Sequence, residues 1–548
     1  MLLAEVAATS DAVAATRSRL AKRTAIADLL RRVADDAEAG SAEVEIAVAY
    51  LAGELRQRRT GLGWRSLRDL PAPAEEPGLT LTDVDAAFAR MADLSGPGSS
   101  TARQAEAAAL FGAATAREQS LLAGLVSGEL RQGALDSVVV DAVAEAAGVP
   151  ADTVRRAVML AGATGPVARA ALTAGGPEAA TEALATFRLP GGRAGRPLRA
   201  PSAPAVGAAL DKLGAAPGDP SGTAVAVDLK LDGIRIQVHR DGDEVRVFTR
   251  SLHDITARVP EIVAAVRALP ARALVLDGEA LVVGPDGVPR PFQETAARSA
   301  TQGERTAAEE AELAASLELS PFFFDVLHAD GRDLLDEPLR DRLAVLDDLL
   351  ADAAGPLAVR RLVSDDAAAA TAFFDAAVAE GQEGVVVKSL AAPYAAGRRG
   401  AGWVKVKPRH TLDLVVLAVE QGSGRRSGWL SNIWLGARDP AGGFVMLGKT
   451  LDDDDRSGWV MVGKTFKGMT DEMLAWQTER FLNLETRREG HVVHVRPEQV
   501  VEIAFDGVQR STRYPGGVAL RFARVLRYRD DKRVNEVDTI DMLRSLLA

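Results

Sequence analysis

Hydrophobic and polar residues follow three different patterns along the 548-residue chain, and each pattern predicts a different kind of domain. From residue 1 to about 187, apolar positions have helical spacing, as in IADLLRRVADDAEAG, and Gly, Pro and Ser clusters separate the segments. From about 223 to 409 strands and helices mix, and from 412 onward short strands with glycine turns dominate. The patterns predict an all-α domain, an α+β domain and a small β-barrel, in that order.

A stretch rich in Pro and Gly, RLPGGRAGRPLRAPSAPAVG, separates the first two of these domains. Its composition predicts a linker. Four arginines stand in it without an acidic partner, so we expect them to be solvated, or to lie on phosphate if the flanking domains face a nucleic acid: Arg188, Arg193, Arg196 and Arg199. The predicted boundaries are 1–187, 188–220, 221–409 and 410–548.

The most informative stretch of the α+β segment is VAVDLKLDGIRIQVHRDGDEVRVFTR, from Val225 to Arg250. Its alternation predicts two strands around a Lys-x-Asp-Gly turn, with an Asp-Gly turn and a third strand after them. Lys230 is therefore expected at the end of a strand. An amine becomes a nucleophile only when its pKa, which starts near ~10.4, is lowered by desolvation or nearby cations, and Arg235 is a candidate cation. A surface hairpin with a Lys-Asp ion pair is the alternative for this motif alone.

Further strands carry polar residues at their predicted ends. ARALVLDGEALVV predicts a strand, a turn and a strand with Asp277 and Glu279 at the turn, and LSPFFFDVL predicts a buried strand with Phe324. EGVVVK begins with Glu383, and WVKVKP carries two lysines on one strand face.

Many cations near one candidate amine suit a polyphosphate ligand. Carboxylates such as Glu279 and Glu383 suit Mg²⁺. The chemistry expected is attack of the Lys230 amine on a nucleotide α-phosphorus, with metal and cations stabilising the departing pyrophosphate. The chain has no P-loop motif that would indicate ordinary nucleoside triphosphate hydrolysis.

Composition narrows the classes of protein. The absence of cysteine excludes disulfides, thiolate zinc sites and cysteine nucleophiles. The N-terminal residues lack a signal-peptide pattern and no apolar run reaches bilayer length, so we expect a cytoplasmic, nucleoid-associated protein without a membrane partner. A net charge of −11 argues weakly against a nucleic-acid partner, although only the contact surface must be basic.

The order of motifs resembles the ATP-dependent DNA ligases that have an N-terminal helical DNA-binding domain. The resemblance rests on DLKLDGIR, FTRS, LDGE, FFFDVL, EGVVVK, WVKVKP and RYRDDK, all in family order, and SGELRQG resembles a helical-domain stretch that faces the minor groove. It implies a helical DNA-binding domain, a nucleotidyltransferase (adenylation) domain and an OB-fold barrel. It also implies three steps: adenylation of a lysine, transfer of AMP to a 5′-phosphate at a nick, and attack by the 3′-hydroxyl.

The resemblance also implies roles for individual residues. Lys230 is the residue expected to become adenylated, and Asp228 stands where the family has the Glu that contacts the adenine amino group. Glu279 and Glu383 are the expected metal carboxylates. The nucleotide-binding positions it implies are Asp228, Arg235, Arg250, Glu279, Phe324, Arg399, Lys405, Lys407, Arg529 and Lys532.

The implied ligands are ATP, Mg²⁺ with Mn²⁺ as a substitute, and nicked double-stranded DNA, bound by a monomer. RNA ligase is the main alternative among lysyl-nucleotide transferases. The NAD-dependent ligases fit less well, because the chain has no cysteine for their zinc module and has a helical N-terminal domain. The mRNA capping guanylyltransferases leave this domain of nearly two hundred residues unexplained. A non-catalytic DNA-binding protein is the alternative of another class. FVMLGKT and WVMVGKT form a tandem near-repeat with the Asp-rich stretch LDDDDRSG between them, and we expect a tolerated insertion that forms an extra hairpin at a barrel edge.

Overall fold

The structure of the chain is a computed structural model with two compact units. It describes residues 1–36, 40–57, 60–128, 130, 132, 136–189, 195–198, 200–214, 224–284, 289–290, 294–295, 298, 317–353, 357–394, 402–408, 410–422, 426, 428–440, 459–465, 469–514 and 516–547. The first unit comprises Met1–Pro201, Asp232–Arg360 and Ser389–Trp403, and the second comprises Ser202–Leu231, Arg361–Lys388 and Val404–Ala548. The chain therefore passes between units inside the Lys-x-Asp-Gly motif.

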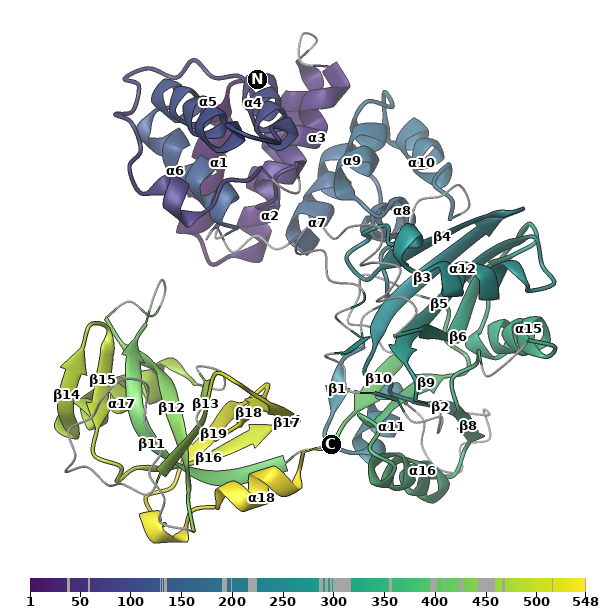
Figure 1. The fold of residues 1–548 in the computed structure, drawn as a ribbon. Helices are drawn as coiled ribbons and strands as arrows, with labels where there is room; N and C mark the ends of the chain where they lie inside the picture. Colours follow the sequence, from purple (N-terminus) through teal and green to yellow (C-terminus); the bar gives the residue numbers. More distant parts are fainter. Residues whose placement is uncertain are drawn as a thin grey trace. The chain divides into compact units, whose positions relative to one another are not determined.

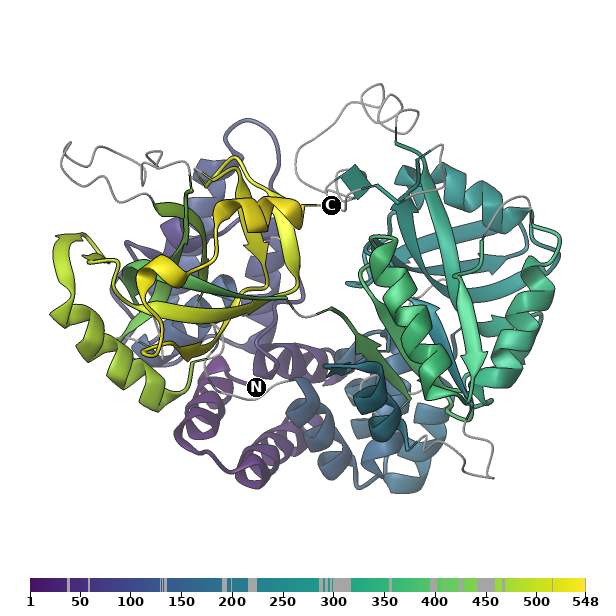
Figure 2. The ribbon, with the colours of Figure 1, turned by 90° about the horizontal axis from the view of Figure 1, so that it is seen from below.

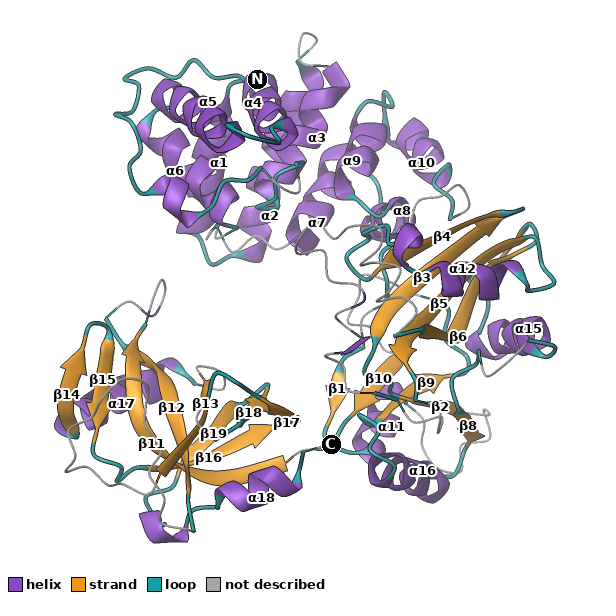
Figure 3. Ribbon diagram, viewed as in Figure 1, coloured by secondary structure: helices purple, strands orange, loops and turns teal. Residues whose placement is uncertain are grey.

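The N-terminal part of the first unit is helical, as predicted (Figures 1 and 3). In α4 (Leu81–Asp93) Leu81, Val84, Phe88 and Met91 form one buried face, and the side chain of Thr80 caps the N-terminus. The other helices of this part are α1 (Leu3–Ala15), α2 (Arg19–Asp35), α3 (Gly40–Leu51), α5 (Ser99–Ala113), α6 (Ala116–Ser127), α7 (Asp136–Ala147), α8 (Ala151–Ala161), α9 (Thr164–Leu172) and α10 (Pro177–Ala185). They enclose one continuous apolar core.

An antiparallel sheet forms the rest of the first unit, in the order β4-β3-β5-β6-β7. Helices α12 and α15 pack against it. Its elements are β3 (Ile234–Asp241), β4 (Glu244–Thr249), α12 (Pro260–Arg267), β5 (Ala273–Val282), β6 (Leu319–Ala329), β7 (Arg332–Asp333) and α15 (Leu339–Leu350). The predicted turn of β3 and β4 is confirmed, with Gly242 at φ +59°.

The predicted turn at Asp277 is wrong, because Asp277 and Glu279 lie inside the continuous strand β5. Gly278 is required here by close packing between strands β5 and β6. A Cβ at this position would lie 2.8 Å from the Phe322 carbonyl oxygen and 2.8 Å from the Phe323 ring, so only glycine lets β5 approach β6 this closely. The Asp-Gly pair is a close-packing site in a strand.

The second unit begins with a five-stranded sheet in the order β1-β10-β9-β2-β8. Its elements are β1 (Ser202–Ala203), α11 (Val206–Leu213), β2 (Val225–Leu229), β8 (Arg361–Ser364), α16 (Ala367–Ala379), β9 (Val385–Ser389) and β10 (Trp403–Val406). Helix α11 lies within the predicted linker, and its Val206, Ala209 and Leu210 are buried in the core of this sheet. The Pro/Gly-rich stretch is therefore not coil throughout, because its C-terminal part has an apolar helical face.

The C-terminal residues of the second unit form the predicted β-barrel, whose yellow strands lie together in Figure 2. Strand β11 (His410–Gln421) is its longest described strand, and it pairs with β12, β15 and β16. The other elements are β12 (Leu430–Arg438), β13 (Trp459–Thr465), α17 (Asp471–Asn483), β14 (Glu485–Glu489), β15 (Val492–Val495), β16 (Val500–Phe505), β17 (Gly507–Arg510), β18 (Val518–Arg521), β19 (Arg524–Tyr528) and α18 (Ile540–Ser545). Among the described helices, none is long and apolar enough to cross a membrane.

Candidate active site

Lys230 directly follows strand β2 in the second unit. Its backbone N–H donates to the Gly384 carbonyl at 2.8 Å, which fixes the lysine beside the segment that leads into β9. Its Nζ forms an ion pair with the Glu383 carboxylate, and its side chain is 22% exposed. The amine is thus held in a partly buried position against an acid.

The Glu383 carboxylate lies between two ammonium groups. Its Oε2 contacts Lys230, and its Oε1 contacts the Nζ of Lys407, which follows β10. Lys407 also lies 3.4 Å from Asp506 Oδ2. Gly384 allows this arrangement, because it has φ +135° and its α-carbon faces the Val406 carbonyl too closely for any side chain. The cluster therefore combines one acid with two amines on neighbouring strands.

Asp228 is buried, with 2% of its surface exposed, on the strand that ends beside Lys230. Its Oδ1 accepts from Arg361 Nε at 2.6 Å, and its Oδ2 accepts from Lys388 Nζ at 2.5 Å and from Arg361 Nη2 at 3.3 Å. A buried carboxylate needs such partners, because an isolated charge in the interior is costly. Both of its oxygens are thus engaged by cations of this chain.

The first unit holds a second group of predicted residues around Arg235. The Arg235 guanidinium donates to Asp277 at 3.0 and 2.6 Å and to the Leu198 carbonyl at 2.8 Å. Burial lowers the pKa of Arg235, but the charge of Asp277 and its neighbours outweighs burial and raises the pKa. Burial, followed by the Asp277 charge, raises the pKa of Tyr394, whose hydroxyl donates to Asp277 at 2.7 Å. Arg235 is therefore a fixed cation.

Two aromatic rings flank this cation. The Arg235 Cζ lies 5.4 Å from the centre of the Phe324 ring and 5.7 Å from that of Trp403. The two rings meet edge to face at 5.7 Å. Half-buried Glu279 lies opposite Arg235 in the β3–β5 register, so one sheet presents a cation, a carboxylate and an aromatic face.

The terminal basic residues Arg529 and Lys532 meet at one carboxylate of the barrel. Arg529 and Lys532 both contact Asp413 of β11, and Arg529 also holds Asp531 at 2.7 Å. The remaining predicted residues are less informative: Arg250 is exposed, Lys405 is half-buried, and Arg399 lies outside the described residues.

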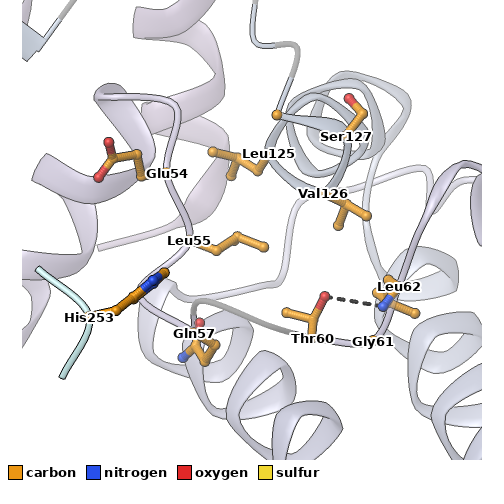
Figure 4. A pocket seen from close by; sticks show the side chains of 11 residues that line it. Glu54, Leu55, Gln57, Thr60, Gly61, Leu62, Leu125, Val126, Ser127 and His253 are labelled. Atoms are coloured by element: carbon orange, nitrogen blue, oxygen red, sulfur yellow. Dashed lines mark hydrogen bonds between the residues drawn. The ribbon is translucent and has the colours of Figure 1, made fainter. Parts of the chain in front are cut away.

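A separate cavity of about 700 Å³ lies in the first unit (Figure 4). The Gln57 Oε1 atom is buried and has no hydrogen-bond partner among the described residues. The cavity is lined by Glu54, Leu55, Gln57, Thr60, Gly61, Leu62, Leu125, Val126, Ser127, Gly128 and His253. None of the predicted nucleotide-binding residues lines it, so it is distinct from both groups described above.

Comparisons with known proteins show the family of the chain. Family models match residues 67–144 (DNA ligase N terminus), 197–407 (ATP dependent DNA ligase domain) and 426–532 (ATP dependent DNA ligase C terminal region). A probable DNA ligase of Beutenbergia cavernae is 71% identical over 547 residues, which cover 100% of this chain and 99% of that protein. The chain belongs to the ATP-dependent DNA ligase family.

A second relative and a solved structure extend the comparison. A probable DNA ligase of Nocardioides sp. is 60% identical, over 100% of this chain and 99% of that protein. A solved structure described as Pmar-Lig_PreS3 covers 96% of this chain and 99% of its own chain, with a TM-score of 0.60 and 16% identity, and therefore shows the same fold. The predicted family and its three-part architecture are confirmed.

One prediction about the linker is wrong for this ligase. Arg196 has an acidic partner, because its guanidinium forms an ion pair with Asp136 and donates to the Thr164 hydroxyl at 3.1 Å. Its Nε donates to the Gly162 carbonyl at 3.2 Å. Arg196 thus anchors the stretch to the helical part of its own unit. Arg193 and Arg199 lie outside the described residues.

Three residues near the ligase motifs escaped sequence reasoning. Arg361 pairs with Asp228, Asp506 lies beside Lys407, and Asp413 contacts the terminal basic residues. Each meets a partner that is far away in sequence, and none belongs to a motif. The β2–β8 register pairs Arg361 with Asp228, and only the tertiary structure reveals the other two contacts.

Proposed function

We propose that this member of the ATP-dependent DNA ligase family seals nicks in duplex DNA through a lysyl-AMP intermediate. The Lys230 Nζ attacks the α-phosphorus of ATP, a nitrogen–phosphorus bond forms, and the bond to pyrophosphate breaks. AMP then passes to the 5′-phosphate at the nick, and attack by the 3′-hydroxyl joins the strands and releases AMP. The observation that carries the proposal is the contact of Lys230 with Glu383, which Lys407 shares.

Besides its proposed place as a Mg²⁺ ligand, Glu383 has two roles in this proposal. An ammonium cannot attack phosphorus, so Lys230 must lose a proton, and Glu383 is the carboxylate in contact with it. Glu383 also holds Lys407, a cation that can move to a phosphate oxygen once ATP binds. Proton transfer from Lys230 and release of Lys407 both involve side chains that are already in contact with Glu383.

The nucleotide contacts follow the two groups of residues. We propose that Arg235, Glu279 and Phe324 bind the nucleoside, with the Phe324 ring stacked on the adenine. The positions proposed for the ribose and phosphates are Arg250, Arg399, Lys405, Lys407, Arg529 and Lys532. Asp228 is one methylene shorter than the Glu of the family and already holds two cations, so its proposed contact with the adenine amino group competes with Arg361 and Lys388.

Mg²⁺ fits the carboxylates proposed for it. No cluster of three or more acidic or histidine ligands occurs among the described residues. Mg²⁺ usually takes one or two carboxylates together with substrate phosphates, and oxygen donors such as Glu279 and Glu383 suit it. When bound it would stabilise charge on the phosphates. Mn²⁺ is proposed as a substitute.

The proposed macromolecular partner is nicked duplex DNA, bound by a monomer in the cytoplasm during replication, repair and recombination. The family match of the helical segment supports a DNA partner. The four-part division at 187, 220 and 409 is retained as a proposal for the functional domains.

A sealing assay tests the proposed function. Purified protein with Mg²⁺ is given a nicked duplex that carries a labelled 5′-phosphate, and ATP, GTP or NAD is supplied separately. We expect joined strands with ATP alone. Joining with NAD would contradict the assigned cofactor, and joining of RNA strands alone would favour an RNA ligase.

A further inference from the structure

The two terminal basic side chains proposed to contact pyrophosphate share one carboxylate of their own barrel. Lys532 Nζ lies 2.5 Å from Asp413 Oδ2, and Arg529 Nη1 lies 3.3 and 3.2 Å from the two Asp413 oxygens. The side chain of Asp413 is 10% exposed and that of Arg529 is 14% exposed. Asp413 is held by its backbone, which exchanges hydrogen bonds with Asp538 at 2.7 and 2.9 Å.

Other acids reinforce this contact. Glu502 is the direct partner of Asp413 in the β11–β16 register and lies 3.7 Å from Arg529 Nη1. The hydrogen bond that Lys532 donates to Asp413, together with the charge of Asp413, raises the pKa of Lys532 despite some desolvation. The hydrogen bond from Arg529 lowers the pKa of Asp531 to about 2. Both cations are therefore satisfied by carboxylates of the barrel.

A cation that donates to Asp413 cannot make the same hydrogen bonds to a phosphate. The side chains must first leave the carboxylate, and the free energy of that separation reduces the affinity for the phosphate ligand. The cost is greater than for exposed pairs, because one carboxylate holds two donors and is itself nearly buried.

We propose that Asp413 is a positioning residue that competes with the polyphosphate of ATP for Arg529 and Lys532. The inference rests on the proposed function. Asp413 keeps the two cations on the barrel when no nucleotide is present, and it takes them back when pyrophosphate leaves. It thereby weakens ATP binding and favours release of the product.

The test is Asp413→Asn in the full chain, which keeps the shape and the backbone bonds but removes the charge. We expect the KM for ATP in self-adenylation to fall about fivefold with little change in kcat, an effect of the size measured for single ion pairs. The pyrophosphate concentration that half-reverses adenylation should fall in parallel. Sealing of a pre-adenylated nick, which needs no pyrophosphate contact, should keep its rate.

Two controls separate competition from a structural effect. Glu498→Gln removes an exposed carboxylate of the same barrel, which pairs with Arg496 at 2.7 Å, and should leave the KM unchanged. Asp413→Asn in a background with Arg529→Met and Lys532→Met should have no further effect on the KM. Asp413→Ser is a second neutral variant and should lower the KM as Asn does.

An unchanged or higher KM in the folded Asp413 variants would overturn the inference. An equal fall of the KM when Asp413→Asn is added to the Arg529→Met, Lys532→Met background would also overturn it, because the competition would then not act through these two cations. If the wild-type chain takes no label from ATP, the proposed function fails instead, and the two failures are thus distinguishable.

Discussion

A single carboxylate, Glu383, joins the proposed nucleophile to a proposed phosphate ligand. Substitution of this one residue is therefore the sharpest test of its role. Glu383→Gln keeps the size of the side chain and removes its charge, so it can neither accept the Lys230 proton nor hold Lys407 as an ion pair. We expect self-adenylation to slow by about 10²-fold or more, as for loss of a general base.

Single-turnover labelling with α-labelled ATP measures this rate. Glu244→Gln is the matched control, because the Glu244 side chain is 62% exposed and forms an ion pair with the Arg246 side chain at 2.6 Å. It should react as the wild type does. A Glu383→Gln enzyme that is labelled at the full rate would remove Glu383 from the proposed chemistry.

His239 gives a pH-dependent prediction at the same scale. Burial, followed by the charge of His328, lowers the pKa of His239 to about 4, below the ordinary ~6.5 of an unfolded chain. The unfolded state therefore binds the proton first, and stability is full above pH 6.5 and falls as the pH decreases toward 4. The whole effect is about 3 kcal/mol, since one pKa unit corresponds to ~1.36 kcal/mol.

Urea unfolding at pH 7 and pH 5 checks the prediction. His239→Gln should lose less stability than the wild type between these two values. His253→Gln, in which an exposed histidine is replaced, should keep the wild-type pH dependence. Parallel losses in the wild type and His239→Gln would show that this histidine does not carry the effect.

At the scale of elements, strand β5 depends on one glycine. Gly278→Ala would place a methyl group 2.8 Å from the Phe322 carbonyl oxygen, a backbone atom that cannot move without disturbing the β5–β6 ladder. We expect a loss of about 1–3 kcal/mol in the free energy of unfolding, as for overpacked sites. Chemical denaturation followed by circular dichroism measures it.

Gly207→Ala is the control for the backbone change alone. A Cβ at Gly207 meets no atom within 4 Å, and the residue lies in helix α11, where alanine is favoured. This variant should be as stable as the wild type or slightly more stable. If both variants have equal stability, close packing at Gly278 is not the cause.

The same elements show what sequence reasoning can predict. The strands around Lys230 and the turn at Gly242 follow from local alternation and turn chemistry, and they were predicted correctly. The contact of Asp228 with Arg361 could not be predicted, because the β2–β8 pairing joins residues 133 positions apart and no local pattern encodes it. The Asp277–Gly278 pair predicted a turn, but the two residues lie inside strand β5. Gly278 is needed there for close packing against β6, and not for a turn.

At the scale of the whole molecule, the chain crosses between its two compact units at Leu231 and Asp232. Asp228 and Lys230 belong to one unit, and Arg235 belongs to the other. The ligase motifs were therefore recognisable in order along the chain, whereas their partition between units could not be predicted from spacing. Contacts between residues far apart in sequence define a compact unit, whereas the spacing of motifs along the sequence carries information only on local structure.

Lys230 is proposed to become covalently adenylated. The most direct measurement is incubation of the full chain with Mg²⁺ and α-labelled ATP, followed by denaturation and detection of label on the protein. The wild type should carry the label, Lys230→Ala should carry none, and Lys212→Ala, a control lysine on α11, should be labelled normally. Label on the Lys230→Ala protein, or none on the wild type, would contradict the assignment of Lys230 as the adenylated residue.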